Sequence, residues 1–314
     1  MANSIKQNVK KARKCENLND PIDTYIIDYV AMFFSSIFIK LHIIPNVITV
    51  LSGIVGVTGG ILLIFDSLLL NVIGVLLIIL SAVFDACDGQ VARLTKRYSN
   101  LGRTLDGLFD LFVYLSIYIA LCIRLFPANI PFTDIQWGWR IIPLAFIAFY
   151  FHGAQARTAD YFKNLHMYVI KNNNELSRSS NIKKEIAECK SFFERLRLKG
   201  YLLYTKAQES DCPKNQKLLD KTEQNGGVSE QLSEAYGQKS RKYVKFTNFL
   251  TFNLRTIILF ILLFLPYHLE CFFFPLLIVV FEVIRVLIIL KFEKLAKSLL
   301  NREELFVNTE RNDK

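Results

Sequence analysis

Four aspartates lie at the facing ends of two long apolar stretches of the sequence. Asp85 and Asp88 close the first stretch, and Asp106 and Asp110 open the second, with a short basic segment between them. At about 100° per residue, each pair falls on one face of a helix. Because two helices joined by a short loop pack antiparallel, the two acidic faces can meet. Ionisable residues in apolar helices are rare and usually face the interior of a bundle or a polar cavity.

Four carboxylates that lie close together repel one another unless cations neutralise them. Divalent cations that prefer oxygen ligands suit such a cluster, and Mg²⁺ suits it best where phosphate is handled. A carboxylate in the same place can also take a proton from a hydroxyl group. The aspartates alone leave two other interpretations open: helix ends that simply reach water, and an ion or proton pathway. Cys87 lies between two of the aspartates with no histidine nearby in sequence, so we do not expect a nucleophile there.

The composition is that of a membrane protein. Of the 314 residues, 52% are hydrophobic, and the mean hydropathy is +0.29. The formal net charge of +10 fits basic loops beside anionic lipid better than a surface for nucleic acid. The six cysteines are far apart without a CxxC pair, which argues against a zinc knuckle or a disulfide framework. The polar, basic amino terminus does not resemble a secretory signal.

Six stretches are long and apolar enough to cross a membrane, since a spanning helix needs roughly 20 mostly apolar residues. They are residues 46–65, 71–93, 104–124, 138–157, 247–266 and 272–290. Residues 23–42 could form a seventh span, but the charges of Asp23, Asp28 and Lys40 favour an amphipathic helix that lies in the membrane interface. The predicted fold is therefore an all-α integral membrane protein with six transmembrane helices and an amino-terminal interfacial helix.

The distribution of lysine and arginine predicts the orientation. Lysine and arginine occur before the first predicted span, in the loop 94–103 and after the last span. The loops 66–70 and 267–271 contain neither. The positive-inside rule then places both termini and the four aspartates on the cytoplasmic side. The chain divides into a cytoplasmic amino terminus with the interfacial helix (1–45), a membrane domain (46–157 and 247–290), a cytoplasmic helical insert (158–246) and a cytoplasmic tail (291–314).

The insert is hydrophilic, with more basic than acidic residues. Residues 182–208 predict an amphipathic helix capped by Ser180 or Asn181, between loops at 172–181 and 223–227. We expect the insert to be a solvated helical segment on the membrane surface. A regulatory or partner-binding role is the alternative.

The region of the aspartates resembles a known family signature. The pattern Asp85-x2-Asp88-Gly89-x2-Ala92-Arg93-x8-Gly102-x3-Asp106-x3-Asp110 is similar, without departure at any position, to that of the CDP-alcohol phosphotransferases, which are integral membrane enzymes. The segment IPNVIT (44–49) is similar to the family's Pro-Asn-x-x-Thr segment. The resemblance extends over residues 21–165 and 247–290, and the insert is not part of the common core.

This resemblance implies a reaction in which an alcohol attacks a CDP-linked donor, giving a phosphodiester and CMP. By position, Asp85, Asp88 and Asp106 would hold two divalent ions, Mg²⁺ or Mn²⁺, and Asp110 would complete the set and act as general base. The donor pocket would comprise Asn46, Thr49, Gly89, Ala92, Arg93 and Gly102. Of these, Asn46 and Thr49 would either contact the nucleotide or hold the first helix against it. The resemblance further implies the bacterial cytoplasmic membrane, with the active site facing the cytoplasm, and a homodimer.

Two arrangements of substrates fit such a family. Six spans look like the bacterial phosphatidyltransferases, which favours CDP-diacylglycerol as donor and a small polar alcohol as acceptor. The alternative is a choline or ethanolamine type, in which a soluble CDP-alcohol donates to diacylglycerol. An ion-coupled transporter would need charges spread through the membrane depth, and a scaffold gains nothing from the aspartates.

The only indication of the acceptor substrate in the sequence is a set of basic side chains. Arg157, Lys163 and Arg255 would provide a lining suited to an acceptor that carries phosphate, such as inositol phosphate or glycerol phosphate. The segment QARTAD (155–160) is similar to one in phosphatidylinositol-phosphate synthases. Simple anchoring on the cytoplasmic side remains the other interpretation of Arg157 and Lys163. Glu282 and Arg285 are expected to form an intrahelical pair.

Overall fold

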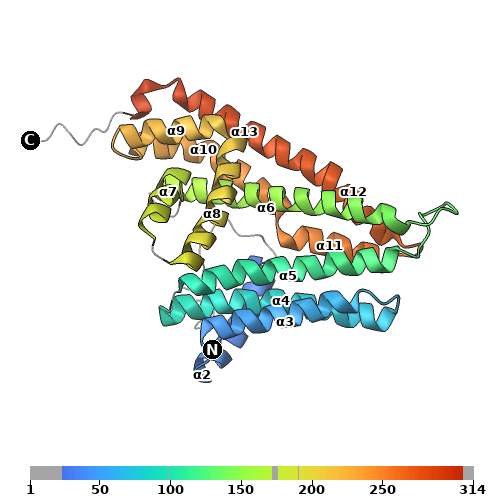
Figure 1. The fold of residues 1–314 in the computed structure, drawn as a ribbon. Coiled ribbons are helices and arrows are strands. Elements are labelled where there is room, and N and C mark those ends of the chain that lie inside the picture. Colours follow the sequence, from blue (N-terminus) through green and yellow to red (C-terminus); the bar gives the residue numbers. More distant parts are fainter. Residues whose placement is uncertain (1–22, 98, 172–175, 190, 307–314) are drawn as a thin grey trace, which may run out of the picture. The chain divides into compact units, whose positions relative to one another are not determined.

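The computed structural model is helical and describes residues 23–97, 99–171, 176–189 and 191–306 (Figure 1). No strand forms among these residues, although Asn129 and Gln136 make an isolated bridge. The all-α class predicted from the sequence is thus confirmed for the part of the chain described. The chain divides into two units, residues 1–150 with 252–278 and residues 151–251 with 279–314.

Five helical segments are long and apolar enough to cross a membrane: 45–62, 68–95, 105–125, 230–263 and 269–300. They overlap five of the six predicted spans, so the protein is an integral membrane protein. The remaining one, 138–157, lies in a helix that is less apolar because it carries His152, Gln155 and Arg157. The count of six, like the interfacial position of residues 23–42, therefore stays a prediction.

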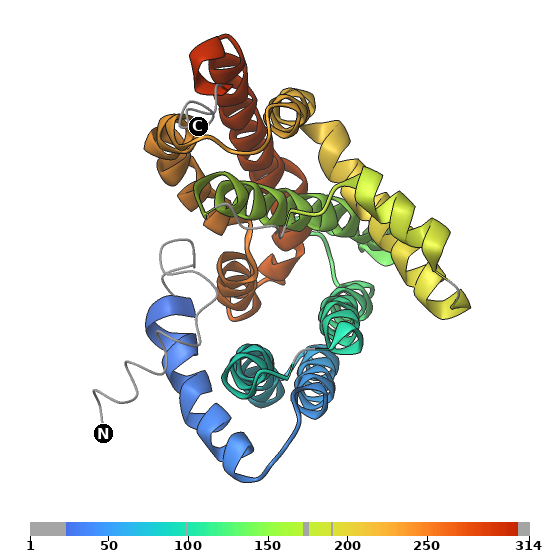
Figure 2. The same ribbon diagram turned by 90° about the vertical axis from the view of Figure 1, so that its left-hand side faces the viewer.

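The first unit contains the helices that carry the aspartates. Its elements are the π-helical turn Asp23–Ile27, α2 (Asp28–Lys40), α3 (Pro45–Leu62), α4 (Leu68–Thr95), α5 (Asn100–Leu125), a 3-10 turn (Gly138–Arg140), the first turns of α6 (Ile141–Lys171), α11 (Phe252–Leu263), a 3-10 turn (Leu269–Phe272) and α12 (Phe273–Leu276). Helix α3 packs against both α4 and α5, and α2 packs against the other side of α4 (Figure 2).

Glycines on α3 allow this close double contact. A Cβ atom at Gly59 would lie 2.7 Å from the carbonyl oxygen of Gly74 on α4, and one at Gly53 would overlap the ring of Phe109 on α5. Next to Gly53, the hydroxyl of Ser81 on α4 donates a 2.9 Å hydrogen bond to the carbonyl oxygen of Ser52. Small residues of this kind drive helix association in lipid, where the hydrophobic effect does not bring helices together.

We expect Gly59→Ala to lower the stability of the protein. The added methyl group meets the backbone of α4, which cannot rotate away, so the helices must separate at a cost of about 1–3 kcal/mol. Thermal unfolding in detergent measures the effect. The matched control is Gly153→Ala in α6, where a Cβ meets nothing within 4 Å. Equal melting temperatures for the two variants would contradict the close packing of α3 on α4.

The second unit contains the insert and the carboxyl-terminal helix. Its elements are the rest of α6, α7 (Ser179–Glu188), α8 (Phe192–Asp211), α9 (Pro213–Gln224), α10 (Glu230–Phe246), a 3-10 turn (Thr247–Leu250), most of a π-helical turn (Leu277–Phe281), α13 (Glu282–Leu300) and a 3-10 turn (Glu303–Phe306). Helix α13 packs against α9 and α10. The predicted tail after residue 290 therefore continues as a packed helix.

Two predictions for the insert are wrong in detail. The single helix expected over 182–208 is divided into α7 and α8, because Ser191 caps a new helix by accepting from the backbone nitrogen of Glu194. Helix α7 begins at Ser179 with Arg178 at its N-cap position, so neither Ser180 nor Asn181 is the cap. Of the loop expected at 223–227, residues 223 and 224 belong to α9, and the part after Gln224 is confirmed as a turn with positive φ angles at Gly226 and Gly227. Of the loop at 172–181, residues 172–175 lie outside the described residues.

A carboxylate joins the insert to the carboxyl-terminal helix. Glu293 of α13 accepts hydrogen bonds from the backbone nitrogens of Lys214 (3.0 Å) and Asn215 (3.1 Å) at the start of α9. The side-chain amide of Asn215 donates a third bond, at 2.7 Å. A negative group satisfies the free N–H groups of a helix amino terminus and interacts favourably with its dipole. Helices α9 and α13 are thereby fixed to each other.

Candidate active site

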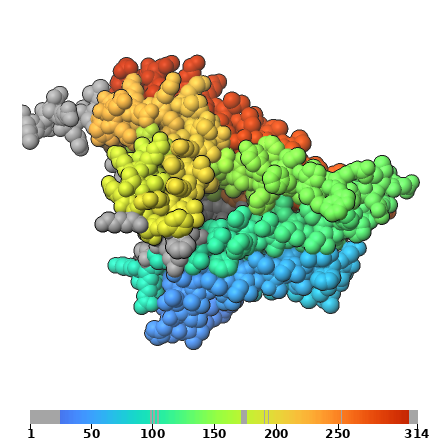
Figure 3. Space-filling model, in the orientation of Figure 1, coloured from blue at the N-terminus to red at the C-terminus, as the bar shows by residue number. Residues whose placement is uncertain are grey.

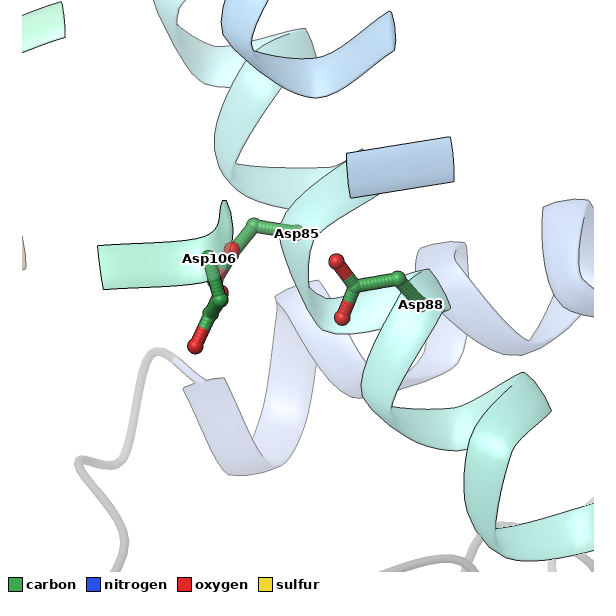
Figure 4. A group of neighbouring side chains, drawn as sticks. All are labelled: Asp85, Asp88 and Asp106. Atoms are coloured by element: carbon green, nitrogen blue, oxygen red, sulfur yellow. The ribbon is translucent and has the colours of Figure 1, made fainter. Parts of the chain in front are cut away.

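Three of the four aspartates converge. Asp85 and Asp88 on α4 and Asp106 on α5 each offer a carboxylate oxygen, and these oxygens all lie within 4.8 Å of one another (Figure 4). All three side chains are half-buried. The acidic faces of α4 and α5 therefore meet.

Asp110 lies beside this group, one helical turn after Asp106. It is more exposed than the other three, and its charge interacts with those of Asp85 and Asp106. The structure thus brings three carboxylates together as a cluster and leaves the fourth next to it. Asp85, Asp88 and Asp106 are therefore half-buried beside other carboxylates, whereas Asp110 is more exposed.

The donor set of the three converging aspartates fits a divalent cation. Half-buried carboxylates this close together repel strongly unless a positive charge lies among them. Carboxylate oxygens are the ligands that Mg²⁺ and Mn²⁺ prefer. The residues present are therefore suitable for a hard divalent metal ion.

Thr49 positions one of these carboxylates. It lies in α3, only 3% of it is exposed, and its hydroxyl donates to a carboxylate oxygen of Asp88. The sequence suggested two roles for Thr49: contact with a nucleotide, or attachment of the first helix to the site. The hydrogen bond provides the second. Groups that orient a metal-binding carboxylate in this way typically affect metal affinity by about 10–100-fold.

We expect Thr49→Val to raise the Mg²⁺ or Mn²⁺ concentration needed for half-maximal activity, by about 10–100-fold. Valine keeps the size and branching of threonine but cannot donate to Asp88. The control is Thr49→Ser, which keeps the hydroxyl and should restore metal affinity. Direct Mn²⁺ binding, measured by electron paramagnetic resonance, separates this effect from slower turnover. A valine variant with the metal requirement of the serine variant would show that the hydroxyl does not orient the carboxylate.

Asn46 and Gly102 are brought together through Ser99. The hydroxyl of Ser99 donates to the amide oxygen of Asn46 (3.1 Å) and accepts from the backbone nitrogen of Gly102 (2.8 Å). A Cβ at Gly102 would lie 2.6 Å from the amide oxygen of Asn46, so glycine is needed for this contact. Sequence reasoning missed Ser99. The preference for serine just before a helix could have identified it as the N-cap of α5.

Arg93 and Gly89 lie one helical turn apart on α4. A Cβ at Gly89 would lie 3.1 Å from the nearest guanidinium nitrogen of Arg93, so the arginine side chain lies back over the glycine. Ala92 is half-buried beside it. The three residues therefore follow the aspartates on the same helix, and their role in donor binding remains a prediction.

The opposite side of α4 is attached to α2 by polar contacts that the sequence did not indicate. The hydroxyl of Ser35 donates to the amide oxygen of Gln90 (3.1 Å), whose amide nitrogen donates to the carbonyl oxygen of Asp28 (3.1 Å). The Cys87 sulfur is buried and lies 3.2 Å from the carbonyl oxygen of Ala31. Residues this far apart in sequence give no local pattern from which such pairs could be found.

The three cations predicted for the acceptor fall in different units. Arg255, on α11 of the first unit, is 2% exposed and interacts electrostatically with Tyr114 and Tyr118 of α5. Arg157 and Lys163 lie on the part of α6 that belongs to the second unit. Their role in acceptor binding stays a prediction.

Arg157 lies near a network that the sequence revealed only in part. A nitrogen of its guanidinium is 3.8 Å from a carboxylate oxygen of Asp211, at the end of α8. The same carboxylate accepts from Arg285 at 3.1 Å. The predicted pair of Arg285 with Glu282 is confirmed, at 2.6 Å. Sequence reasoning missed Asp211, because its partners are distant in the chain.

Comparisons with known proteins agree with this site. Residues 42–159, which include α3, α4, α5 and all four aspartates, match the family model for CDP-alcohol phosphatidyltransferase. A similar curated protein is the "Bifunctional IPC transferase and DIPP synthase" of Aquifex aeolicus (strain VF5), 28% identical over 134 residues, which are 43% of this chain and 26% of that protein. The chain thus spans about a quarter of the length of that relative. No solved structure matches.

The matched family consists of transferases of phosphate-containing groups, and the matched residues include three helices that are long and apolar enough to cross a membrane. This match with the CDP-alcohol phosphatidyltransferase family covers less than half of the chain. The resemblance stated from the aspartate signature is thereby confirmed, and the family generally works with divalent metal ions.

Proposed function

We propose that the protein transfers a phosphatidyl group from CDP-diacylglycerol to a small polar alcohol and releases CMP. The observation that carries this proposal is the convergence of Asp85, Asp88 and Asp106, with Asp110 beside them, inside the region that matches the family. A transporter needs no such cluster at the end of two helices. A phosphate-transferring enzyme needs one, because its donor carries several negative charges.

The chemistry assigned to the aspartates is a single substitution at phosphorus. Asp110 accepts the proton of the acceptor hydroxyl, and the acceptor oxygen forms a bond to the phosphorus of the phosphatidyl group. The bond from that phosphorus to the oxygen of CMP breaks, and CMP leaves with the electron pair. Two divalent ions held mainly by Asp85, Asp88 and Asp106, with Asp110 completing the set beside them, would supply positive charge to the diphosphate and the departing CMP.

The remaining predicted site residues surround the donor. Arg93 can donate to phosphate oxygens, and charge-assisted bonds of this type are among the strongest in proteins. Gly89 and Gly102 leave space for the diphosphate, with Ala92 beside them. Asn46 is aligned by Ser99, and Thr49 by its bond to Asp88, so α3 contributes both a polar side chain and a support for the metal-binding carboxylate.

The acceptor is proposed to be a phosphorylated polyol, with inositol phosphate or glycerol phosphate favoured. Arg157, Lys163 and Arg255 support this choice by their charge. The name of the Aquifex relative gives two activities, and this chain covers only 26% of that protein. The name therefore does not select one acceptor for this chain.

Release of CMP by the purified chain in liposomes tests the proposal. With CDP-diacylglycerol and Mg²⁺ or Mn²⁺, the screen compares inositol phosphate, inositol, glycerol phosphate, serine and ethanolamine. We expect CMP with one of the phosphorylated acceptors. Activity only with CDP-choline or CDP-ethanolamine and diacylglycerol would favour the choline type instead. No CMP with any donor and acceptor would contradict an enzyme and reopen the interpretation as an ion-coupled transporter.

The location follows from the same proposal. We place the enzyme in the bacterial cytoplasmic membrane with its aspartates facing the cytoplasm, since Lys and Arg gather in the segments on that side. Helix α6 would supply the sixth span and residues 23–42 the interfacial helix, and the enzyme would act as a homodimer. Protease or labelling accessibility of the loop 94–103 from the two sides of the membrane tests the orientation.

A further inference from the structure

One side of α8 is exposed and apolar although it belongs to a well-packed helix. Phe192, Leu196 and Leu203 are 73%, 59% and 69% exposed. They recur at helical spacing and so lie on one face. The opposite side of the helix is buried, with Leu198 and Thr205 at 5% and 2% exposed. The exposed face is therefore not a frayed end, and Leu196 and Leu203 have no covering element among the described residues.

Basic residues border this apolar row. Arg195, Lys199 and Lys206 are all exposed, and at about 100° per residue they lie directly beside Phe192, Leu196 and Leu203. We call these six residues the α8 face. The same geometry places Glu194 and Glu209 on other sides of the helix, and Glu209 is engaged with Ser179 at the start of α7. The α8 face is thus apolar and positively charged, with no carboxylate on it.

Helix α8 lies across the axis of a helix of the second unit that is part of a candidate membrane span. In Figure 1, α8 runs across the direction of α6 and α13, and Figure 3 shows α7 and α8 at the surface of the molecule. Its last residue, Asp211, contacts Arg285 in the candidate span 269–300. Arg285 precedes the basic residues Lys291, Lys294 and Lys297 of the same helix. Helix α8 therefore meets α13 just before the part of α13 that carries these lysines.

We propose that the α8 face docks on the surface of the bilayer and binds anionic lipid headgroups there. A helix with large apolar side chains on one side and lysine or arginine along the border inserts its apolar residues at the boundary between headgroups and acyl chains. Each lysine or arginine near an anionic surface strengthens binding by about fivefold. Removal of all three cations of the α8 face then lowers the ratio of docked to undocked helix by on the order of a hundredfold.

Tryptophan quenching by brominated lipid tests this contact on the full-length protein. The Leu203→Trp chain is reconstituted in nanodiscs of phosphatidylcholine, with or without phosphatidylglycerol, in which the acyl chains carry bromine close to the headgroup. Position 203 is exposed, so the substitution does not disturb packing. The unsubstituted chain, whose two tryptophans are Trp137 and Trp139, supplies the background. We expect strong quenching of the added tryptophan in the discs that contain phosphatidylglycerol.

The matched control is Tyr201→Trp, on the same helix but on the side away from the α8 face, which we expect to escape quenching. Replacement of Arg195, Lys199 and Lys206 by glutamine in the Leu203→Trp chain should abolish most of the quenching. Quenching of both positions alike, or of neither, overturns the proposal. Protection of position 203 from both bromine and aqueous iodide also overturns it, because protein, such as a second copy, would then cover the face. The readout involves no turnover and is independent of the transferase reaction.

Discussion

The Asp110→Asn variant should release CMP about 10²–10⁴-fold more slowly than the unsubstituted protein, with little change in its metal requirement. The reason is the place of Asp110 beside, and not within, the group of three converging carboxylates. Asparagine has nearly the same shape but cannot take a proton from the acceptor hydroxyl. CMP release in liposomes with saturating CDP-diacylglycerol measures the effect, and Mn²⁺ binding measured on the same preparation gives the metal affinity.

A matched control is Asp134→Asn. Asp134 is an exposed carboxylate in the segment between α5 and α6, outside the region of the four aspartates. Its substitution should leave both turnover and Mn²⁺ binding unchanged. If Asp110→Asn turned over at a near-normal rate, the assignment of Asp110 as general base would be wrong. If it lost Mn²⁺ binding together with activity, Asp110 would be mainly a metal ligand.

The Asp88→Asn variant should fail in a different way, by losing metal affinity. Asp88 offers an oxygen to the converging group and also accepts from Thr49. Asparagine lacks the negative charge and one of the two oxygens of the carboxylate, and both are needed to hold a cation. We expect the Mg²⁺ or Mn²⁺ concentration for half-maximal CMP release to rise by at least about 10–100-fold. This is the effect expected for the loss of a group that only orients the carboxylate, such as Thr49. High metal concentration should restore part of the activity.

Comparison of the two aspartate variants separates the roles. Titration of Mn²⁺ should restore the activity of Asp88→Asn but not that of Asp110→Asn. A high metal concentration compensates for weaker metal binding, but it does not compensate for the loss of the general base. The same rescue in both variants would show that all four carboxylates serve the metal alone. Rescue in neither, with normal Mn²⁺ binding in both, would contradict the assignment of Asp88 to the metal.

The part of the site predicted from the sequence is the part that lies on two neighbouring helices. The spacing of Asp85 and Asp88 determines their shared face, and the short loop to α5 brings Asp106 opposite them. Helical geometry is local, so these relations can be worked out without a structure. The same holds for Glu282 and Arg285, three residues apart on α13.

Contacts between distant segments could not be predicted in this way. The bond from Ser35 to Gln90 joins residues 55 apart in sequence, and nothing in either segment indicates the other. The position of α3 between α4 and α5 was also not foreseen, although its glycines are visible in the sequence. Glycines show that a helix can be approached closely, but they do not show which helix approaches.

Helix boundaries in the insert were the other failure. Residues 182–208 have a helical pattern of apolar residues throughout, and the end of α7 at Glu188 costs only a few local hydrogen bonds. The capping of α8 by Ser191 and the bond between Glu209 and Ser179 offset that cost. Because the second of these contacts folds α7 back onto α8, tertiary structure and not local propensity decides where the helix ends.

The bond network around Glu293 limits how this protein could be shortened to a minimal enzyme. Removal of residues 172–246, the apparent accessory segment, would also remove Lys214 and Asn215, and with them the donors that surround a carboxylate only 8% exposed. Loss of the partners of a buried charge typically costs about 3–5 kcal/mol. A successful truncation would therefore require an apolar or neutral replacement of Glu293 at the same time, so the insert and the carboxyl-terminal helix must be redesigned together.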